Sequence, residues 1–393
     1  MKTSDSGFED KIFAAYVGGA IGDGIGAPIE GLKREAILGL IGPVEDFPPP
    51  TEIIDGLPRI VERSDGKGDG RITDDTLMVE ALIDCYLTQR DHLDARAYQE
   101  IFAPQLATRP LWIPEWRKET PLLPRLANSE RLHIQGLLRT GRDPRFFGAT
   151  LHQISCGAAM FAWPIGAVNA GDPRGAYDEA VAFFAAQTHS YGVEQAAVMA
   201  AATAEALRPG ATPRSVVDAA LALAKDGTLG MIRAAVGALT PGEDRNADLT
   251  AVHRAVQPWH HKGHHVADDQ EHAGEHASEP LRFSNIGMES RLHTSEELPV
   301  ALAMLLRAEG DFRETVCASA EYGEDADSIA GMAGTLAGAL GGLQCIPADW
   351  VETVARQNRR DPGKTAREFT SCIRTLFELD AQRQRSRHFT LAT

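Results

Sequence analysis

Apolar residues return every three or four positions along most of the chain, which is the period of a helix with one buried face. In the first such stretch, Ile12, Tyr16 and Ala20 fall on one side. The pattern predicts helices over residues 8–25, 73–89, 146–162, 177–186, 192–207, 213–224, 229–239, 295–307, 312–322, 328–343, 347–356 and 365–382. Alternating apolar and polar residues, which are typical of strands, form no run of useful length. The chain is therefore predicted to be all-α.

Three segments lack a sustained period and predict loops. Residues 42–70 are rich in proline and glycine, residues 104–124 are irregular, and residues 257–280 are polar and hold most of the histidines. We interpret 257–280 as a His-rich loop or insertion and not as a domain boundary, because the strongest acidic motif follows it and needs the N-terminal motifs beside it. Residues 1–393 are accordingly predicted to form a single domain.

Two segments without a charged residue, 154–171 and 329–346, approach the length of a membrane span. Both are rich in glycine and alanine, which are weakly hydrophobic, so we expect buried helices and no membrane partner. The five cysteines are scattered without a CxxC pair, and residues 1–11 are polar. These features predict reduced thiols in a cytoplasmic protein.

The formal net charge of −16 argues against nucleic acid as a partner, because binding to phosphates needs a basic surface. Acidic residues that gather around bound cations would be offset locally. The charge therefore favours metal chemistry with a small-molecule or protein-linked ligand over nucleic-acid recognition. The sequence does not define an oligomeric state.

Two acidic motifs stand at predicted helix starts. Thr73-Asp74-Asp75-Thr76 places two carboxylates beside hydroxyl groups, and these are the hard oxygen ligands that Mg²⁺ and Mn²⁺ prefer. The alternative interpretation is a helix cap with two acids favoured by the helix dipole.

Residues 324–328 form the second motif, and the helix after them is nearly all glycine, alanine and leucine. Acids that enter a buried helix need a compensating cation or donor, which favours metal.

A third motif, residues 22–31, combines closely spaced glycines with Asp23 and Glu30. A dinucleotide-binding loop is excluded because a helix precedes the motif where a strand is needed. Residues 65–76 partly match an EF-hand loop, but Lys67 and Thr76 stand where carboxylate ligands are needed, so calcium binding is rejected too. Glu30 is left as a candidate metal ligand or base.

Taken in order along the chain, these motifs resemble the ADP-ribosylglycohydrolase family. Its GD-x-x-G-x-x-x-E pattern matches Gly22, Asp23, Gly26 and Glu30, its TDDT matches residues 73–76, and its D-x-D-[TS] matches Asp325, Asp327 and Ser328. A G-A-A-M stretch followed by P-[IL]-[GA] matches residues 157–160 and 164–166, and a TH motif matches Thr188 and His189. The resemblance runs from about residue 8 to residue 350.

The resemblance implies an all-α, single compact orthogonal multi-helix domain that binds two Mg²⁺ or Mn²⁺ ions. It implies that Thr73, Asp74 and Asp75 ligate one ion, that Asp325 and Ser328 ligate the other, and that Asp327 bridges them. It also implies that Glu30 reaches the substrate ribose or the metals, and that His189 and the Gly157 turn position the ligand.

Three positions depart from the family pattern. Cys156 stands where relatives usually have Asn, Phe161 where they have Arg, and Glu324 where Gly is common. Cys156 and Phe161 complete the predicted substrate-binding set with Glu30, Gly157 and His189. A pocket that has lost an amide and a guanidinium is expected to recognise a different ribosyl compound.

The function implied is hydrolysis at C1 of a ribose, with release of ADP-ribose from an ADP-ribosylated acceptor. Metals can order the ribose hydroxyls and lower the pKa of a bound water, while a carboxylate handles the proton. Glu30, Asp74 and Asp75 are the candidates for that proton role. Hydrolysis of a small N- or O-riboside without ADP is the first alternative, and a non-catalytic binding or structural member of the same fold is the second.

Overall fold

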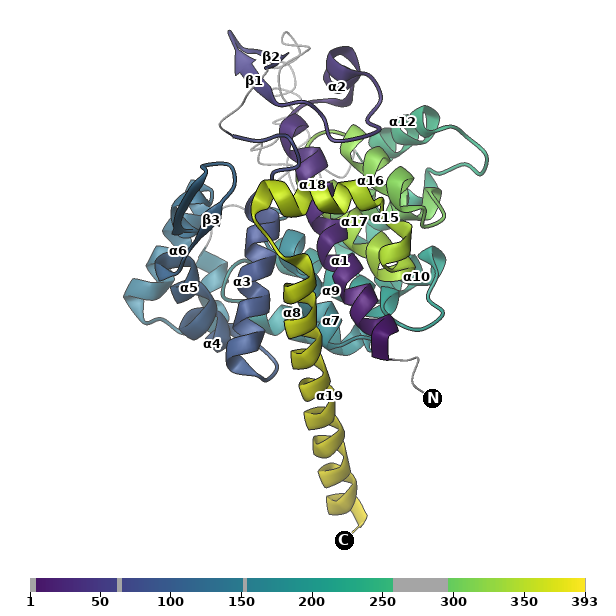
Figure 1. Cartoon of the computed structure of the whole chain (residues 1–393). Helices are drawn as coiled ribbons and strands as arrows, with labels where there is room; N and C mark the ends of the chain where they lie inside the picture. The colour runs from purple at the N-terminus through teal and green to yellow at the C-terminus, as the bar shows by residue number, and fades with distance from the viewer. Residues whose placement is uncertain (1–4, 62–65, 151–153, 257–295, 393) are drawn as a thin grey trace.

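The computed structural model describes residues 5–61, 66–150, 154–256 and 296–392, and helices dominate it (Figure 1). The longer helices are α1 (Asp5–Gly26), α2 (Arg34–Ile41), α3 (Asp74–Gln89), α5 (Ala103–Thr108), α6 (Asn128–Thr140), α7 (Trp163–Val168), α8 (Pro173–Phe184), α9 (Tyr191–Ala206), α10 (Pro213–Leu223), α11 (Asp226–Gly237), α12 (Arg245–Val256), α15 (Glu297–Arg307), α16 (Phe312–Glu321), α17 (Ala326–Gly341), α18 (Ala348–Asn358) and α19 (Pro362–Ala392). The short turns are η1 (Ala27–Ile29), α4 (Ala95–Ala97), η2 (Tyr98–Phe102), η3 (Leu123–Arg125), η4 (Pro144–Thr150), η5 (Ala159–Phe161) and η7 (Leu343–Cys345). The all-α prediction is confirmed.

Two of the predicted loops contain small antiparallel hairpins. Strands β1 (Thr51–Ile54) and β2 (Leu57–Ile60) pair within residues 42–70, and β3 (Pro110–Ile113) and β4 (Lys118–Pro121) pair within residues 104–124. Each strand has four residues, which is too short for an alternating pattern to be recognised in the sequence. The His-rich stretch 257–280 lies outside the described residues, so its interpretation stays a prediction.

The helix predicted over residues 146–162 is wrong, because the chain forms the η4 and η5 turns there and residues 154–158 are not helical. Gly148 accounts for part of this: its amide donates to the Ala185 carbonyl, and a Cβ at Gly148 would lie 2.1 Å from the Thr188 carbonyl oxygen. The backbone is therefore fixed by contacts with a distant segment and not by the local helical period. Of the charge-free stretch 154–171, only η5 and α7 are helical.

Helices α1 and α17 pack backbone against backbone through the centre of the molecule (Figure 1). A Cβ on Gly22 would lie 2.0 Å from the Ala330 carbonyl oxygen, and one on Gly334 would lie 2.2 Å from the Gly18 carbonyl oxygen. Only glycine permits this approach. The packing confirms a buried helix within residues 329–346, and it places the end of α1 beside the start of α17.

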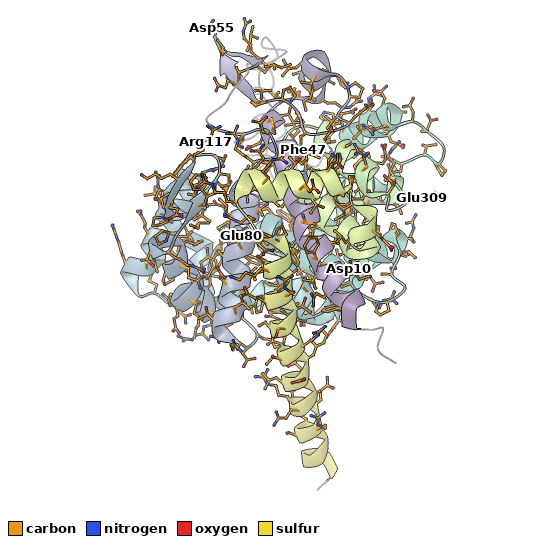
Figure 2. All side chains as sticks on the ribbon, in the orientation of Figure 1. Asp10, Phe47, Asp55, Glu80, Arg117 and Glu309 are labelled. Atoms are coloured by element: carbon orange, nitrogen blue, oxygen red, sulfur yellow. The ribbon has the colours of Figure 1, made fainter. Side chains whose placement is uncertain are left out.

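Polar side chains fix the segment that leads into α3. The side chain of Asn358, at the end of α18, makes two hydrogen bonds to this segment. Its Nδ2 donates to the Gly70 carbonyl at 2.9 Å, and its Oδ1 accepts from the Ile72 backbone amide at 3.0 Å. Glu80, labelled in Figure 2, accepts from the Tyr16 hydroxyl at 2.7 Å and from Arg360 Nε at 2.7 Å. Helix α3 is thereby tied to α1 and to the link between α18 and α19.

Among the described residues, one helical stretch, Gly7–Ile29, is long and apolar enough by length and composition to cross a membrane. Within its most apolar window, 89% of the residues are buried inside the protein. The same composition is typical of a core helix, and this stretch is largely the α1 that packs on α17. Helix α19 extends beyond the rest of the fold at its C-terminal end (Figure 1).

Candidate metal centre

Asp23, near the end of α1, holds the first turn of α3. Its carboxylate accepts from the Thr73 amide at 3.0 Å, from the Thr76 amide at 3.2 Å and from the Thr76 hydroxyl at 2.5 Å. The side chain is fully buried. Burial and the nearby Asp327 carboxylate raise the pKa of Asp23 to about 7. Asp23 therefore joins the first acidic motif to the second.

Thr73 caps α3, as predicted. Its hydroxyl accepts from the Asp75 amide at 3.3 Å, and this hydrogen bond begins the helix. Asp75 is buried, and its carboxylate accepts from the Ser328 hydroxyl at 2.8 Å. Burial, together with the surrounding carboxylates of Asp327 and Asp23, raises the pKa of Asp75 well above its ordinary value. The hydrogen bond between Asp75 and Ser328 brings the two predicted ligand sets into direct contact.

Glu30, Asp325 and Asp327 form one acidic group, in which one carboxylate oxygen from each residue lies within 4.8 Å of the others. A short antiparallel contact brings them together, because the Gly31 amide donates to the Glu324 carbonyl and the Glu324 amide donates to the Leu32 carbonyl. The chain turns at Glu324 with a φ of 58°, in the left-handed region that favours glycine. Glycine would adopt this conformation without the strain that a glutamate carries.

Lys67 is a cation already present at this centre. Its ammonium group forms an ion pair with Glu30 and lies 3.5 Å from Asp327 Oδ2. The nearby Asp327 and Glu115 carboxylates oppose the effect of burial, and the pKa of Lys67 is raised. A positive charge is thus accommodated between two of the predicted metal-site carboxylates.

Asp74 faces a different partner from Asp75. Its carboxylate pairs with Arg125 at 3.1 Å, and Arg125 is also paired with the buried Glu115. Glu130, on α6, faces the same region, and burial followed by the Asp74 carboxylate raises its pKa to about 8. A Cβ on Gly157 would lie 2.1 Å from Glu130 Oε1, so a larger residue at position 157 would displace the Glu130 carboxylate from its present place.

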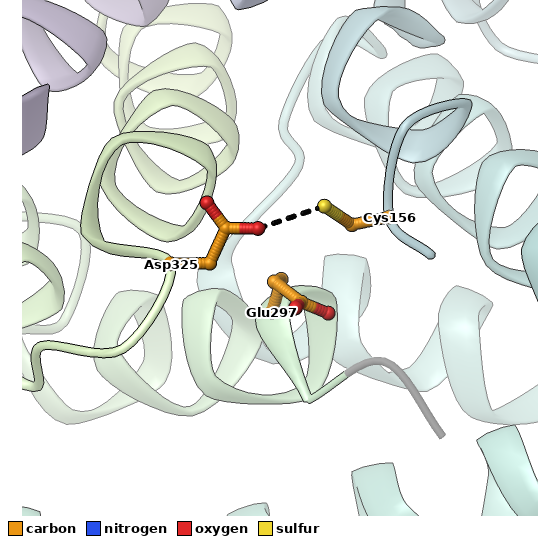
Figure 3. A group of neighbouring side chains, drawn as sticks. All are labelled: Cys156, Glu297 and Asp325. Atoms are coloured by element: carbon orange, nitrogen blue, oxygen red, sulfur yellow. Dashed lines mark hydrogen bonds between the residues drawn. The ribbon is translucent and has the colours of Figure 1, made fainter. Parts of the chain in front are cut away.

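Cys156 lies at the centre, where the position before Gly157 was predicted to contact substrate. Its thiol donates to Asp325 Oδ2 at 2.9 Å and lies 3.7 Å from the Ser328 hydroxyl oxygen. Burial, followed by the Asp325 and Glu297 carboxylates, raises the pKa of the thiol well above its ordinary value. Figure 3 shows Cys156, Glu297 and Asp325 converging from three separate segments.

The Gly157 turn and His189 lie on neighbouring segments. Gln187 Nε2 donates to the Gly157 carbonyl at 2.8 Å, and the Gly192 amide donates to the His189 carbonyl at 3.1 Å. His189 is half-buried and precedes Ser190, whose φ is 53°. The link between α8 and α9, residues 185–190, thus holds the Gly157 turn through the Gln187 hydrogen bond.

Phe161 requires a correction. Its side chain is fully buried, stacks on Phe102 with ring centroids 5.6 Å apart, and meets Phe184 edge-on. It therefore belongs to the aromatic core and does not line a ligand pocket. Phe161 is the last residue of the η5 turn, which directs its side chain inward. The sequence showed only that a phenylalanine replaces the arginine usual at this position, and it did not show this burial.

Divalent cations fit the residues of this centre. Four carboxylates (Asp23, Asp75, Asp325 and Asp327) are buried together, and such a group is costly without positive charge. The raised pKa values of Asp23 and Asp75 have mutual repulsion among their causes. Oxygen-rich sites of this kind suit Mg²⁺ or Mn²⁺.

Four contributors escaped the sequence predictions as site residues: Asp23, Lys67, Glu130 and Glu297. Asp23 was visible as part of the glycine-rich motif, since an acid among glycines in an apolar helix signals a buried carboxylate. Lys67, Glu130 and Glu297 belong to no motif. Their approach depends on how distant segments meet, so no local pattern could have identified them.

An all-helical fold with a cluster of buried carboxylates where α1, α3 and α17 meet is the arrangement expected of an ADP-ribosylglycohydrolase. Residues 4–385 match the family model of ADP-ribosylglycohydrolase. The chain belongs to the ADP-ribosylglycohydrolase family.

Individual relatives match less extensively. The ADP-ribosylarginine hydrolase Tri1 of Pseudomonas putida (strain GB-1) is 39% identical over 71 residues, which is 18% of this chain and 19% of that protein. The chain thus matches only about a fifth of that relative's length. A solved structure described as an ADP-ribosylglycohydrolase-related protein complex aligns with a TM-score of 0.50 and 19% identity, over 94% of this chain and 99% of that one. This second likeness shows the fold alone.

Proposed function

We propose that the protein is a metal-dependent hydrolase that cleaves a bond at C1 of a ribose and releases ADP-ribose from an ADP-ribosylated acceptor. The observation that carries the proposal is the convergence of Glu30, Asp75, Asp325 and Asp327 in a chain whose family is defined by such hydrolases. A single-domain organisation and a cytoplasmic location belong to the same proposal. The five free thiols support that location, and the net charge of −16 argues against a nucleic-acid substrate.

Two Mg²⁺ or Mn²⁺ ions would be held by Thr73, Asp74, Asp75, Asp325, Asp327 and Ser328, with Glu30 beside them. When bound, such ions polarise oxygen ligands and lower the pKa of coordinated water. Asp325 belongs to both groups of potential ligands, so the structure favours Asp325 over Asp327 as the residue shared between two positions.

Glu30 is the carboxylate best placed to handle the proton. Its side chain is 26% exposed, whereas Asp75 is 7% exposed and accepts a hydrogen bond from Ser328. Asp74 is engaged by Arg125. A general base must reach the proton that it removes, and Glu30, although paired with Lys67, has a more exposed side chain than Asp74, at 26% against 18%, which favours Glu30. Asp74 and Asp75 then serve as metal ligands and supply negative charge that balances the ions.

The test is product release from a panel of ribosyl compounds, measured by mass spectrometry with Mg²⁺ or Mn²⁺ and with chelator. The panel holds ADP-ribosyl-arginine, ADP-ribosyl-serine, ADP-ribose and simple N- and O-ribosides. We expect metal-dependent release of ADP-ribose, and its abolition in an Asp325→Ala, Asp327→Ala double variant that keeps its helical circular dichroism. Absence of release from every compound by a metal-loaded protein would favour the non-catalytic alternative.

Cys156 supports the second candidate function, hydrolysis of a small riboside without ADP. Its thiol is directed at Asp325 in place of the amide that relatives usually present, so one polar contact for a larger ligand is missing. Phe161 no longer supports this candidate, because it lies in the core. Release of ribose from simple ribosides alone would establish the riboside hydrolase instead.

A further inference from the structure

Cys156, Glu297 and Asp325 form a compact group of potential metal ligands of mixed chemistry. One ligand atom from each residue lies within 4.8 Å of the others, and all three residues are buried (Figure 3). Glu297 comes from the first turn of α15, Asp325 from the position before α17, and Cys156 from the link before η5. The group therefore depends on three segments of the chain and not on a local motif.

The position of Cys156 is fixed by its own backbone. The Ala159 and Met160 amides both donate to the Cys156 carbonyl, at 2.6 Å and 3.1 Å. The thiol is thereby directed at Asp325 Oδ2, 2.9 Å away. A tetrahedral Zn²⁺ with bonds of about 2.0–2.3 Å holds its ligand atoms about 3.3–3.7 Å apart. The three ligand atoms here lie within 4.8 Å of one another, which is of the same order.

Glu297 is directed differently from its neighbour in sequence. The Glu296 carboxylate accepts from the Tyr322 hydroxyl at 2.7 Å, whereas Glu297 lies with the Cys156 and Asp325 side chains. Two buried carboxylates and a sulfur atom in one group favour a borderline or soft divalent ion, because thiolate prefers Zn²⁺ to Mg²⁺. The group formed by Glu30, Asp325 and Asp327 offers oxygen alone.

We propose that Cys156, Glu297 and Asp325 bind a thiophilic divalent ion, Zn²⁺ being the natural candidate, next to the oxygen-only position. On binding, the Cys156 thiol loses its proton to solvent and the thiolate sulfur bonds to the ion. Asp325 is shared by the two positions, so the centre is of mixed metal type. This inference rests on the proposed function and deepens it, because it replaces one of the two Mg²⁺ or Mn²⁺ ions proposed there by a thiophilic ion that binds Cys156 and Glu297 as well as Asp325.

Cobalt is the probe that tests the site, since a thiolate bound to Co²⁺ produces a sulfur-to-metal charge-transfer absorption in the near ultraviolet. The full-length, chelator-treated protein is titrated with Co²⁺ and then with Zn²⁺, without any substrate. We expect the absorption in the unmodified protein and in Cys317→Ala, a buried cysteine outside the group. We expect its loss in Cys156→Ala, with Cys156→Ser as the substitute where alanine disturbs the circular dichroism.

Glu297→Gln gives a second measurement, with Glu296→Gln as its matched neighbour. Loss of one ligand is expected to weaken Zn²⁺ binding about tenfold or more in Glu297→Gln, while Glu296→Gln stays close to the unmodified protein. Absence of the charge-transfer absorption in the unmodified protein, or its persistence in both Cys156 variants, would overturn the proposal. Equal Zn²⁺ affinity in the two glutamine variants would do the same.

The outcomes separate this inference from the proposed function. Release of ADP-ribose with Mg²⁺ alone, together with no thiolate signal, would remove the thiophilic position and leave the hydrolase. A clear thiolate signal with no release from any ribosyl compound would leave the metal position and remove the hydrolase.

Discussion

The α1–α17 interface and the contact of α19 with α3 and α8 hold helices together in different ways. At the first, glycine backbones touch, and a Cβ on Gly22 would overlap the Ala330 carbonyl. At the second, the Glu179 carboxylate of α8 accepts from Tyr86 at 2.8 Å and pairs with His92 at 2.6 Å, and His92 also pairs with Asp380 of α19 at 2.9 Å.

The comparison shows that helix positions are fixed most tightly next to the acidic centre. Backbone packing between α1 and α17 leaves no room for adjustment, and it is this packing that positions Asp23 beside Asp327. The charged contact around His92 is partly exposed, is adjustable, and lies away from the acidic centre. Changes at the first interface should therefore affect both fold and metal centre, whereas changes at the second should affect stability in a pH-dependent way.

The largest effect is expected from Gly22→Ala. The added methyl group would lie 2.0 Å from the Ala330 carbonyl oxygen, so α1 and α17 must separate. We expect a loss of about 3 kcal/mol or more in the free energy of unfolding, measured by urea denaturation, and weaker Mn²⁺ binding. Gly39→Ala is the control, because no atom lies within 4 Å of its Cβ position in α2. It should gain about 0.5–1 kcal/mol. Equal effects at both glycines would contradict the comparison.

Asp23→Ala should follow in size. The substitution leaves the Thr73 and Thr76 amides and the Thr76 hydroxyl without their buried acceptor. We expect a cost of about 2–3 kcal/mol by denaturant unfolding, since each unsatisfied buried donor is expensive. Asp10→Ala, on the same helix, loses one hydrogen bond from the Leu343 amide and should cost about 1 kcal/mol. A smaller cost for Asp23→Ala than for Asp10→Ala would mean that Asp23 does not clamp α3.

His92→Gln tests the charged contact through pH. The Glu179 hydrogen bond raises the pKa of His92 to about 9 from 6.5. The stabilisation from a raised histidine pKa is fully present below pH 6.5 and disappears as the pH rises through 9. We expect the unfolding free energies of the two proteins to differ by about 1–2 kcal/mol at pH 6 and to converge near pH 10.

Arg174→Gln removes a well-exposed ion pair with Asp178 and serves as the control for His92→Gln. Its effect should stay below about 0.5 kcal/mol at both pH values. If the His92→Gln difference were the same at pH 6 and pH 10, the protonated histidine would have no part in holding α19.

Apart from the control variants, the smallest effect is expected from Glu324→Gly, which should stabilise the protein where the other substitutions destabilise it. Glu324 has a φ of 58°, which costs a non-glycine residue about 1–2 kcal/mol. Relief of this strain is partly offset by the greater freedom of glycine in the unfolded chain. We expect a net gain of about 0.5–1 kcal/mol in the free energy of unfolding, seen as a higher midpoint of thermal unfolding. Gly323→Ala, at a φ of 83° and with its Cβ 2.4 Å from the Leu32 carbonyl oxygen, should be destabilising. A lower midpoint for Glu324→Gly would show that the buried glutamate side chain outweighs the strain.

The helical period was sufficient to find α1, α3, α8, α9, α16 and α17, because each buries a regular apolar face or is apolar throughout. It failed for α2, α6 and α12. It also failed over residues 146–162, where Gly148 is pressed against the backbone of residues 185–188. Periodicity reports how a segment divides its residues between water and core, and it carries no information on a contact with a distant backbone.

The acidic motifs allowed Asp75, Asp325, Asp327 and Ser328 to be proposed from the sequence as metal ligands, since carboxylates that enter a buried, glycine- and alanine-rich helix need a compensating cation or donor. Only the tertiary structure decided that Asp23 clamps α3, that Lys67 pairs with Glu30, that Phe161 lies in the core, and that Cys156 meets Glu297. Ligand chemistry is a property of residue types, which a sequence displays directly. Proximity between segments that are distant in the sequence is a property of packing, and the glycine contacts of α1 with α17, which bring Asp23 beside Asp327, are an example of it.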